Sequence, residues 1–260
     1  MHATNYYKAT SASDAANKLD AAEDGMILAG GQTLIPTMKA RLAAPSDLVA
    51  LRMAGLTGIT RTGTEVTIGA MTTHAEVGAS GDVPACLAAL ARGIGDPAVR
   101  HRGTIGGSVA NNDPAADYPA ACLALGATIV TNIREIPAAD YFQGMFDTAL
   151  DEGEVITAIR FPDPERGAYA KFPNPASRYA MVGVFVAQTG GDIRVAVTGA
   201  GESGVFRHAG IETALAADFS AQAVDGVSVS ADGLLSDLHG DAEYRAALIK
   251  AMAKRAVEAI

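Results

Sequence analysis

Short apolar stretches with helical or strand-like spacing alternate along the chain. Residues 13–22 repeat small and apolar side chains with a period of about 3.6, which predicts a helix, and residues 26–29 form an apolar run that predicts a buried strand. This run leads directly into the double glycine Gly30-Gly31. The order predicts a strand that turns at the glycines into a second helix.

Strand-like patterns are most frequent in the middle and later parts of the chain. Residues 47–51 predict a strand, and residues 58–70 alternate around Gly63 as in a β-hairpin. The sequence THAE, which starts at Thr73, has the pattern of a capping box and predicts the start of a helix. Further elements are predicted at residues 83–92, 155–161, 168–172, 180–187, 193–200 and 241–259. This mixture of helices and strands indicates an α+β fold.

Clusters of proline and glycine near Pro45 and at residues 162–167 interrupt the pattern. With 260 residues the chain is long enough to build a substantial core from two or three packed units. We expect three units, at residues 1–55, 56–165 and 166–260.

Composition narrows the class of protein. Hydrophobic residues make up 49% of the chain and charged residues 19%, which is typical of a globular protein. Twenty basic and 29 acidic residues give a net charge of −9, and this excess of acid disfavours binding to nucleic acid. The first residues, MHATNYYKAT, lack the basic start and apolar core of a signal peptide, and no apolar run reaches membrane-spanning length. We therefore expect a cytoplasmic protein without membrane insertion.

Residues that bind metals or act as nucleophiles form no recognisable pattern. The two cysteines, Cys86 and Cys122, lie in Ala/Leu-rich stretches and are expected to be buried thiols. An iron–sulfur cluster needs about four thiolates, so this chain does not hold one unaided. The five histidines show no HExxH or HxH spacing, and no GxSxG sequence is present. We predict no metal ligands and no catalytic residues on this chain.

Two similar glycine phrases carry the strongest chemical signal. AGGQT spans residues 29–33 and TIGGS spans residues 104–108. Glycine has no Cβ, so its backbone can approach a ligand closely and direct N–H groups at phosphate oxygens, and a helix that starts there adds its dipole. The hydroxyls of Thr33, Thr104 and Ser108 can donate to the same anion. A tight turn explains either phrase alone, whereas the pair favours a site that holds a pyrophosphate from both sides.

The two glycine phrases favour a dinucleotide as the ligand that carries this pyrophosphate. Neither phrase is followed by the Lys-Ser/Thr pair of a Walker loop, which disfavours phosphoryl transfer. Residues 199–204, GAGESG, match the Rossmann pattern GxGxxG after a strand. Gly210 interrupts the expected next helix, however, and too few elements follow for a doubly wound sheet. We therefore interpret GAGESG as a turn and place the dinucleotide at the two glycine phrases.

Two acids follow the second phrase in the sequence NNDPAADYP. Asp113 precedes a proline and is expected to form a turn. Asp117 is either a turn residue or a partner for a hydroxyl or ring nitrogen of the cofactor, and the spacing alone leaves both open.

Four longer phrases resemble a known family. AGGQTLIPTMKARLA, VRHRGTIGGSVANNDPAADYPAA, YAKFPNPASRYAMVGVFVA and LLSDLHGDAEYRAALI are similar to the FAD-binding medium subunit of the xanthine dehydrogenase and carbon monoxide dehydrogenase family of molybdenum hydroxylases. The resemblance covers nearly the whole chain. It implies a PCMH-type, vanillyl-alcohol-oxidase-like FAD fold with subdomains at residues 1–55 and 56–165, and a C-terminal α+β domain of the carbon monoxide dehydrogenase flavoprotein type at residues 166–260.

The resemblance also implies the residues that contact FAD. Asp117 is implied to hydrogen-bond FAD, and Lys171 to lie near the flavin ring, where its charge would stabilise the reduced form. Ile94 and Ile156 are implied apolar contacts, whereas the sequence by itself favours an ordinary surface role for Lys171. The implied set is Leu28, Ala29, Gly30, Gly31, Gln32, Thr33, Leu34, Ile94, Thr104, Ile105, Gly106, Gly107, Ser108, Asp117, Ile156 and Lys171. Gln32 and Thr33 replace side chains that are more usual in the family but keep hydrogen-bonding groups.

An electron-transfer function follows from the resemblance. It implies that electrons leave a substrate at a molybdenum cofactor on a large subunit, cross iron–sulfur clusters on a small subunit and reach FAD on this chain, from which a small molecule or carrier removes them. A dimer of heterotrimers is also implied. Two alternatives remain open: a non-catalytic scaffold or assembly module with the same fold, and a stand-alone NAD-dependent dehydrogenase that uses residues 199–204.

Overall fold

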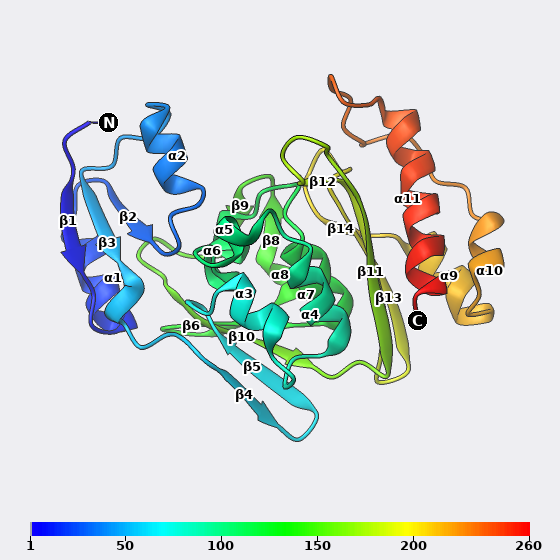
Figure 1. Ribbon diagram of the computed structural model, residues 1–260, viewed down its shortest axis with the longest axis horizontal. Helices are drawn as coiled ribbons and strands as arrows, with labels where there is room; N and C mark the ends of the chain where they lie inside the picture. Colours follow the sequence, from blue (N-terminus) through cyan, green and yellow to red (C-terminus); the bar gives the residue numbers. More distant parts are fainter. Residues whose placement is uncertain (1) are drawn as a thin grey trace.

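Three main sheets follow one another along the chain in the computed structural model, which describes residues 2–260 (Figure 1). The first is parallel, in the order β1 (Asn5–Lys8), β3 (Asp47–Ala50) and β2 (Gly25–Leu28). Its connections contain α1 (Ala12–Asp20) and α2 (Leu34–Lys39). The predicted strand at residues 26–29 is present as β2, but β2 is only partly buried because this sheet is small.

The second sheet is antiparallel and has five strands. Its order is β4 (Ile59–Thr62), β5 (Glu65–Gly69), β10 (Ile156–Pro162), β6 (Thr128–Thr131) and β7 (Glu135–Pro137). β4 and β5 form the predicted hairpin. The connection from β5 to β6 contains α3 (His74–Ala79), α4 (Ala85–Arg92), α5 (Pro97–Arg100), α6 (Ile105–Asn111) and α7 (Tyr118–Leu125). Short elements complete this region: η1 (Leu51–Met53), α8 (Ala138–Tyr141), β8 (Phe142–Gly144) and β9 (Asp147–Thr148).

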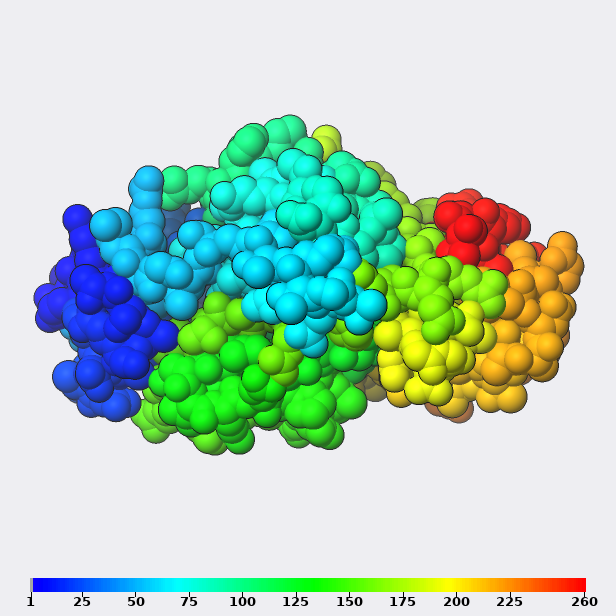
Figure 2. Space-filling model, turned by 90° about the horizontal axis from the view of Figure 1, so that it is seen from below, coloured from blue at the N-terminus to red at the C-terminus, as the bar shows by residue number. Residues whose placement is uncertain are grey.

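The third sheet is antiparallel, in the order β11 (Arg166–Pro173), β12 (Ala180–Thr189), β13 (Asp192–Thr198) and β14 (Phe206–Arg207). Three helices follow it: α9 (Ala209–Ala217), α10 (Ala221–Asp225) and α11 (Ala242–Glu258). In the space-filling view the N-terminal residues lie at one end of an elongated molecule and the C-terminal residues at the other (Figure 2). The strands of each main sheet come from within one predicted unit, and we propose boundaries near residues 55 and 165 on that basis.

Strand β12 shows why a continuous apolar run forms a strand here. Residues 180–187 are all buried because both faces of the sheet are covered, with α11 on one face and α7 on the other (Figure 1). Val182, Val184 and Val186 pack in the cluster that includes α11, whereas Phe185 and Ala187 pack in the cluster that includes α7. The two-residue period of the strand separates these sets.

The predicted capping box is confirmed at the start of α3. Thr73 Oγ1 accepts a hydrogen bond from the N–H of Glu76 at 3.2 Å, and a Glu76 carboxylate oxygen accepts from the N–H of Thr73 at 2.8 Å. The buried-thiol interpretation is confirmed as well, because Cys86 and Cys122 are free and buried. The pKa of Cys86 is raised to about 11 by burial, which keeps its thiol protonated and unreactive.

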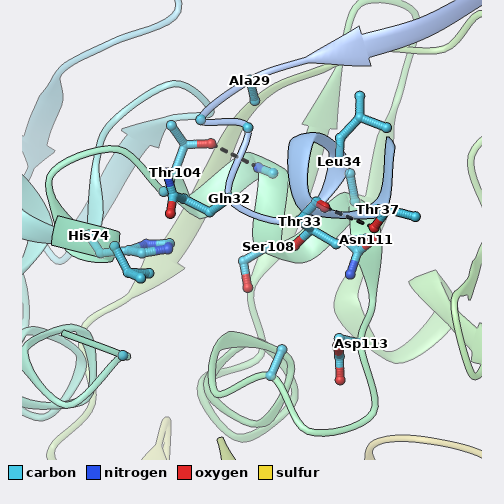
Figure 3. A pocket seen from close by; sticks show the side chains of 18 of the residues that line it. Ala29, Gln32, Thr33, Leu34, Thr37, His74, Thr104, Ser108, Asn111 and Asp113 are labelled. Carbon is cyan, nitrogen blue, oxygen red and sulfur yellow. Dashed lines mark hydrogen bonds between the residues drawn. The ribbon is translucent and has the colours of Figure 1, made fainter. Parts of the chain in front are cut away.

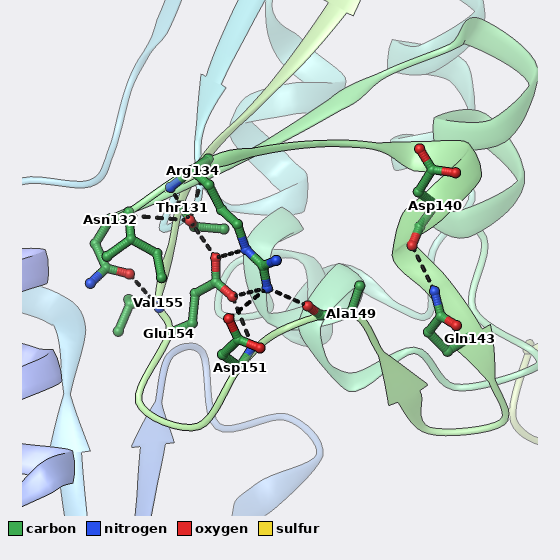
Figure 4. A network of polar contacts seen from close by, with 10 residues as sticks. Thr131, Asn132, Arg134, Asp140, Gln143, Ala149, Asp151, Glu154 and Val155 are labelled. Carbon is green, nitrogen blue, oxygen red and sulfur yellow. Dashed lines mark hydrogen bonds and ion pairs between the residues drawn. The ribbon is translucent and has the colours of Figure 1, made fainter.

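A buried carboxylate ties the turn between β6 and β7 to the segment before β10 (Figure 4). The side chain of Glu154 is fully buried and accepts hydrogen bonds from Thr131 Oγ1 at 2.6 Å and from Arg134 Nη2 at 2.7 Å. It also accepts from the N–H of Asp151 at 2.8 Å. These bonds, first those from Arg134, lower the pKa of Glu154 from 4.5 to about 2.

Replacing Glu154 by glutamine is expected to lower the free energy of unfolding by about 2 kcal/mol at pH 7, because charge-assisted hydrogen bonds are lost in a buried site. Since the folded pKa lies below the unfolded value, this contribution is complete above about pH 4.5 and disappears as the pH falls toward 2. Urea unfolding at pH 7, 4.5 and 3.5 measures it. The exposed Glu152→Gln variant is the control, and an equal difference at all three pH values would contradict the assignment.

Candidate functional site

A cavity of about 610 Å³ lies between the first sheet and the helices of the second. Residues of both glycine phrases line it (Figure 3). Residues 177–179 of the third region line it as well. Eleven of the sixteen predicted residues line the cavity. The predicted residues that line the cavity are Ala29, Gly30, Gly31, Gln32, Thr33, Leu34, Ile94, Thr104, Gly107, Ser108 and Asp117.

The first glycine phrase connects β2 to α2 and presents free N–H groups. Gly31 has φ = +71°, a conformation that glycine adopts without strain. Within residues 2–260, the backbone N–H groups of Gly30, Gly31, Gln32 and Thr33 have no hydrogen-bond acceptor. Thr33 stands at the N-terminus of α2 and its side chain makes no capping bond, although Thr37 Oγ1 donates to its carbonyl (Figure 3). This segment therefore offers a row of unpaired donors to an anion.

Gly30 of the first phrase meets the backbone of the two residues that precede the second phrase. A Cβ on Gly30 would lie 2.8 Å from the carbonyl carbon of Arg102 and 2.8 Å from Gly103 Cα, with the Arg102 oxygen nearer still. Real Cβ atoms do not approach other atoms this closely. Gly30 is thus required for contact between the first sheet and the loop before α6. That contact closes one end of the cavity.

The second phrase forms the first turn of α6 (Ile105–Asn111), and its glycines lie inside the helix. Thr104 is the N-cap and accepts a hydrogen bond from the N–H of Gly107 at 3.2 Å (Figure 3). Gly107 and Ser108 line the cavity. A helix of this length begins here because β-extended Thr104 supplies the cap.

Five predicted residues do not line the cavity: Leu28, Ile105, Gly106, Ile156 and Lys171. Ile105 and Ile156 belong to the hydrophobic core of the second sheet. Gly106 makes space for the backbone of Ala70, since a Cβ would lie 2.5 Å from Ala70 Cβ and 2.8 Å from its Cα. Gly106 thus leaves room for Ala70, and its contact with FAD stays a prediction. Its helix position, about 100° from Gly107, directs it at the sheet.

Asp117, on the cavity wall, is held by two side chains from β11. Tyr169 donates its hydroxyl to Asp117 Oδ1 at 2.5 Å, and Lys171 Nζ lies 3.1 Å from Oδ1 and 3.2 Å from Oδ2. Lys171 also donates to the carbonyl of Gly93 at 2.9 Å. Its side chain is only 11% exposed, so the interpretation as a surface lysine is wrong. Burial raises the pKa of Asp117, while the Lys171 charge and the Tyr169 hydrogen bond lower it.

Neutral donors dominate the cavity. Among its described lining residues, Arg178 is the one lysine or arginine. His74 lies on the side of the cavity away from Asp113, and its ring packs on Tyr118 with centroids 5.4 Å apart (Figure 3). Burial, and then the charge of Arg100, lower the pKa of His74 to about 4, so it is neutral at pH 7. An anion in this cavity would be bound mainly by N–H and hydroxyl groups.

Sequence reasoning missed His74 and residues 177–179 as parts of the site. His74 follows the capping threonine of THAE, a pattern that explains the helix but carries no sign of a cavity. Arg178 and Tyr179 lie in a phrase that carried the resemblance, yet no spacing rule pointed to them. Arg178 has φ = +63°, and its Nη1 donates to the carbonyl of Gly95 at 3.4 Å.

Asp113 forms the expected turn by accepting from the N–H of Ala115 at 2.9 Å, and it also lines the cavity.

The GxGxxG match at residues 199–204 is a turn, as interpreted. The strand before it, β13, is antiparallel to both neighbours, whereas a Rossmann site requires parallel strands. The following helix, α9, does form with Gly210 in its first turn, so the predicted interruption there is wrong.

No helix among residues 2–260 is long and apolar enough to cross a membrane.

Known proteins are similar to this chain in architecture and in sequence. Residues 2–164 match the family described as the FAD binding domain in molybdopterin dehydrogenase. The carbon monoxide dehydrogenase medium chain of Afipia carboxidovorans is 38% identical, over 98% of this chain and 95% of its own length. The nicotine 6-hydroxylase medium subunit of Paenarthrobacter nicotinovorans is 35% identical, over 99% of this chain and 97% of its own.

A solved structure agrees with the sequence matches. In reconstituted CO dehydrogenase from Oligotropha carboxidovorans, one chain superposes with a TM-score of 0.89 at 36% identity, covering 98% of this chain and 96% of that one. The predicted α+β FAD-binding fold is confirmed by this agreement and by the family match. The chain therefore belongs to the FAD-binding medium subunits of the molybdenum hydroxylase family.

Proposed function

We propose that this chain is the FAD-binding electron-transfer subunit of a molybdenum hydroxylase complex. The observation that carries the proposal is the pair of glycine segments that line one cavity, with the N–H groups of residues 30–33 lacking an acceptor among residues 2–260. The family match supports FAD as the ligand. When bound, FAD accepts electrons and passes them to an external acceptor.

The residues present fit FAD. The N–H groups of residues 30–33, together with the first turn of α6, would hold the pyrophosphate, and Thr33 and Ser108 would donate their hydroxyls. Gly31 and Gly107 allow close approach of the backbone. Asp117 would accept a hydrogen bond from a hydroxyl or N–H group of FAD, since an ionised carboxylate is an acceptor only. Lys171, paired with Asp117, would add positive charge behind this wall.

Partner subunits would supply the rest of the electron path. Relatives of this chain are named as medium chains or medium subunits, and we propose that a large molybdenum-cofactor subunit and a small iron–sulfur subunit assemble with it. The chain itself has two cysteines, too few for a cluster. We also propose a cytoplasmic location, which the two free, buried thiols support.

A visible absorption spectrum tests the proposal. The chain is measured as purified, and again after incubation with FAD and gel filtration, and is then reduced with dithionite. We expect retained flavin bands that bleach on reduction. If the same measurement on the assembled complex also shows no flavin, the proposal is wrong. The scaffold alternative would then remain.

A further inference from the structure

The Asp117 carboxylate is oriented by β11 and not by its own helix. Asp117 occupies the N-cap position of α7, where an aspartate usually accepts from a backbone N–H of the first turn, but its side chain makes no such bond. Tyr169 and Lys171, two residues apart on β11, project to the same side of the strand and reach it instead. The orientation of Asp117 thus depends on a residue outside the cavity wall.

Gly183 leaves space for the Tyr169 hydroxyl. Gly183 on the neighbouring strand β12 pairs with Lys171, and a Cβ on Gly183 would lie 2.8 Å from Tyr169 Cζ, with the hydroxyl oxygen nearer still. The Tyr169 ring stacks on Phe185, with centroids 6.0 Å apart. The ring is therefore packed against the core, and a Cβ at residue 183 would displace the hydroxyl that donates to Asp117.

We propose that Tyr169 is a positioning residue that fixes the Asp117 carboxylate toward the cavity, so that Asp117 accepts a hydrogen bond from a hydroxyl or ring N–H group of FAD. This inference rests on the proposed function. Tyr169 and Lys171 share Oδ1, while Oδ2 receives a bond from Lys171 alone. A carboxylate oxygen accepts two hydrogen bonds, and Oδ2 therefore keeps capacity for the ligand.

The arrangement predicts a pH signature. Burial raises the pKa of Asp117, and the Lys171 charge and Tyr169 hydroxyl oppose this effect. Burial, and then the charge of Asp117, raise the pKa of the Tyr118 phenol. Burial, and then the charges of Asp113 and Asp117, raise the pKa of Tyr179. Loss of the Tyr169 hydroxyl would raise the pKa of Asp117 further, so the carboxylate would be protonated, and FAD affinity reduced, beginning at a higher pH than in the wild type.

The Tyr169→Phe variant of the full chain or assembled complex tests the inference. It keeps the stacked ring and removes only the hydroxyl. FAD affinity, measured from flavin fluorescence between pH 5 and 9, is expected to fall about tenfold at pH 7, the cost of one hydrogen bond to a charged group. The fall in affinity at low pH is expected to begin at a higher pH. Gly183→Ala, which displaces the hydroxyl, is expected to act in the same direction.

Tyr118→Phe is the matched control. Tyr118 is next to Asp117 and fully buried, but its hydroxyl has no hydrogen-bond partner among residues 2–260. Its removal should leave FAD affinity and pH profile unchanged. If wild type binds FAD and Tyr169→Phe has the same affinity and profile, the inference is wrong while the proposed function stands. If neither the wild-type chain nor its assembled complex binds FAD, the proposed function is wrong, and the inference falls with it.

Discussion

The Gly30→Ala variant is expected to lose FAD binding by at least about a hundredfold, an effect of about 3 kcal/mol or more. Its new methyl group would occupy the position of the Arg102 carbonyl, which is backbone and has no flexible end to move away. The loop before α6 and the loop after β2 would have to separate. The unpaired N–H groups of residues 30–33 would then no longer face the start of α6.

Flavin content after gel filtration and fluorescence titration measure this effect, and circular dichroism establishes that the variant is folded. Gly81→Ala is the control, because a Cβ on Gly81 meets no atom within 4 Å and its φ is not positive. A folded Gly30→Ala protein with full FAD occupancy would show that contact between the two loops is not needed for the site.

The Asp117→Ala variant is expected to lose both FAD affinity and about 3 kcal/mol of folding free energy, because it leaves the buried Lys171 ammonium without its carboxylate. The expected loss of stability comes from the ion pair, because both of its side chains are nearly buried. Urea unfolding of the flavin-free protein measures the stability separately from FAD binding.

A second substitution separates the two effects. In the double variant Asp117→Ala, Lys171→Met, no buried charge is left unpaired, so most of the lost stability should return. FAD affinity should stay low, since the acceptor on the cavity wall is still missing. Recovery of FAD affinity in the double variant would mean that Asp117 serves only to neutralise Lys171.

Local sequence patterns predicted α1, α4, α11 and the strands β10 to β13 because the causes of these elements are local. The capping box depends on Thr73 and Glu76, which are only three residues apart. The continuous apolar run of β12 itself indicates a strand that is buried on both faces. The two glycine phrases were also recognised, since their spacing and hydroxyls are visible in the sequence. The sequence does not show in which direction each side chain points.

The direction of each side chain decides which of the predicted residues line the cavity. Gly106 and Gly107 are adjacent and chemically identical, but the helix points one at Ala70 and the other at the cavity. Ile156 lies in the core, although resemblance implied a ligand contact. Lys171 looked like a surface residue because its partner is 54 positions away in the chain. Such long-range pairs become visible only when the sheets are assembled.

Helix α7 has a consequence for how the chain can be divided. Nearly all of its residues are buried, and they contact β12 and β13 as well as the helices of the second region. Phe185, Ala187 and Ala196 thus complete the hydrophobic core that belongs mostly to residues 66–161. The family match ends at residue 164, before these side chains. A fragment cut there would expose one flank of α7 to water, so we expect residues 2–164 not to fold independently of the third sheet.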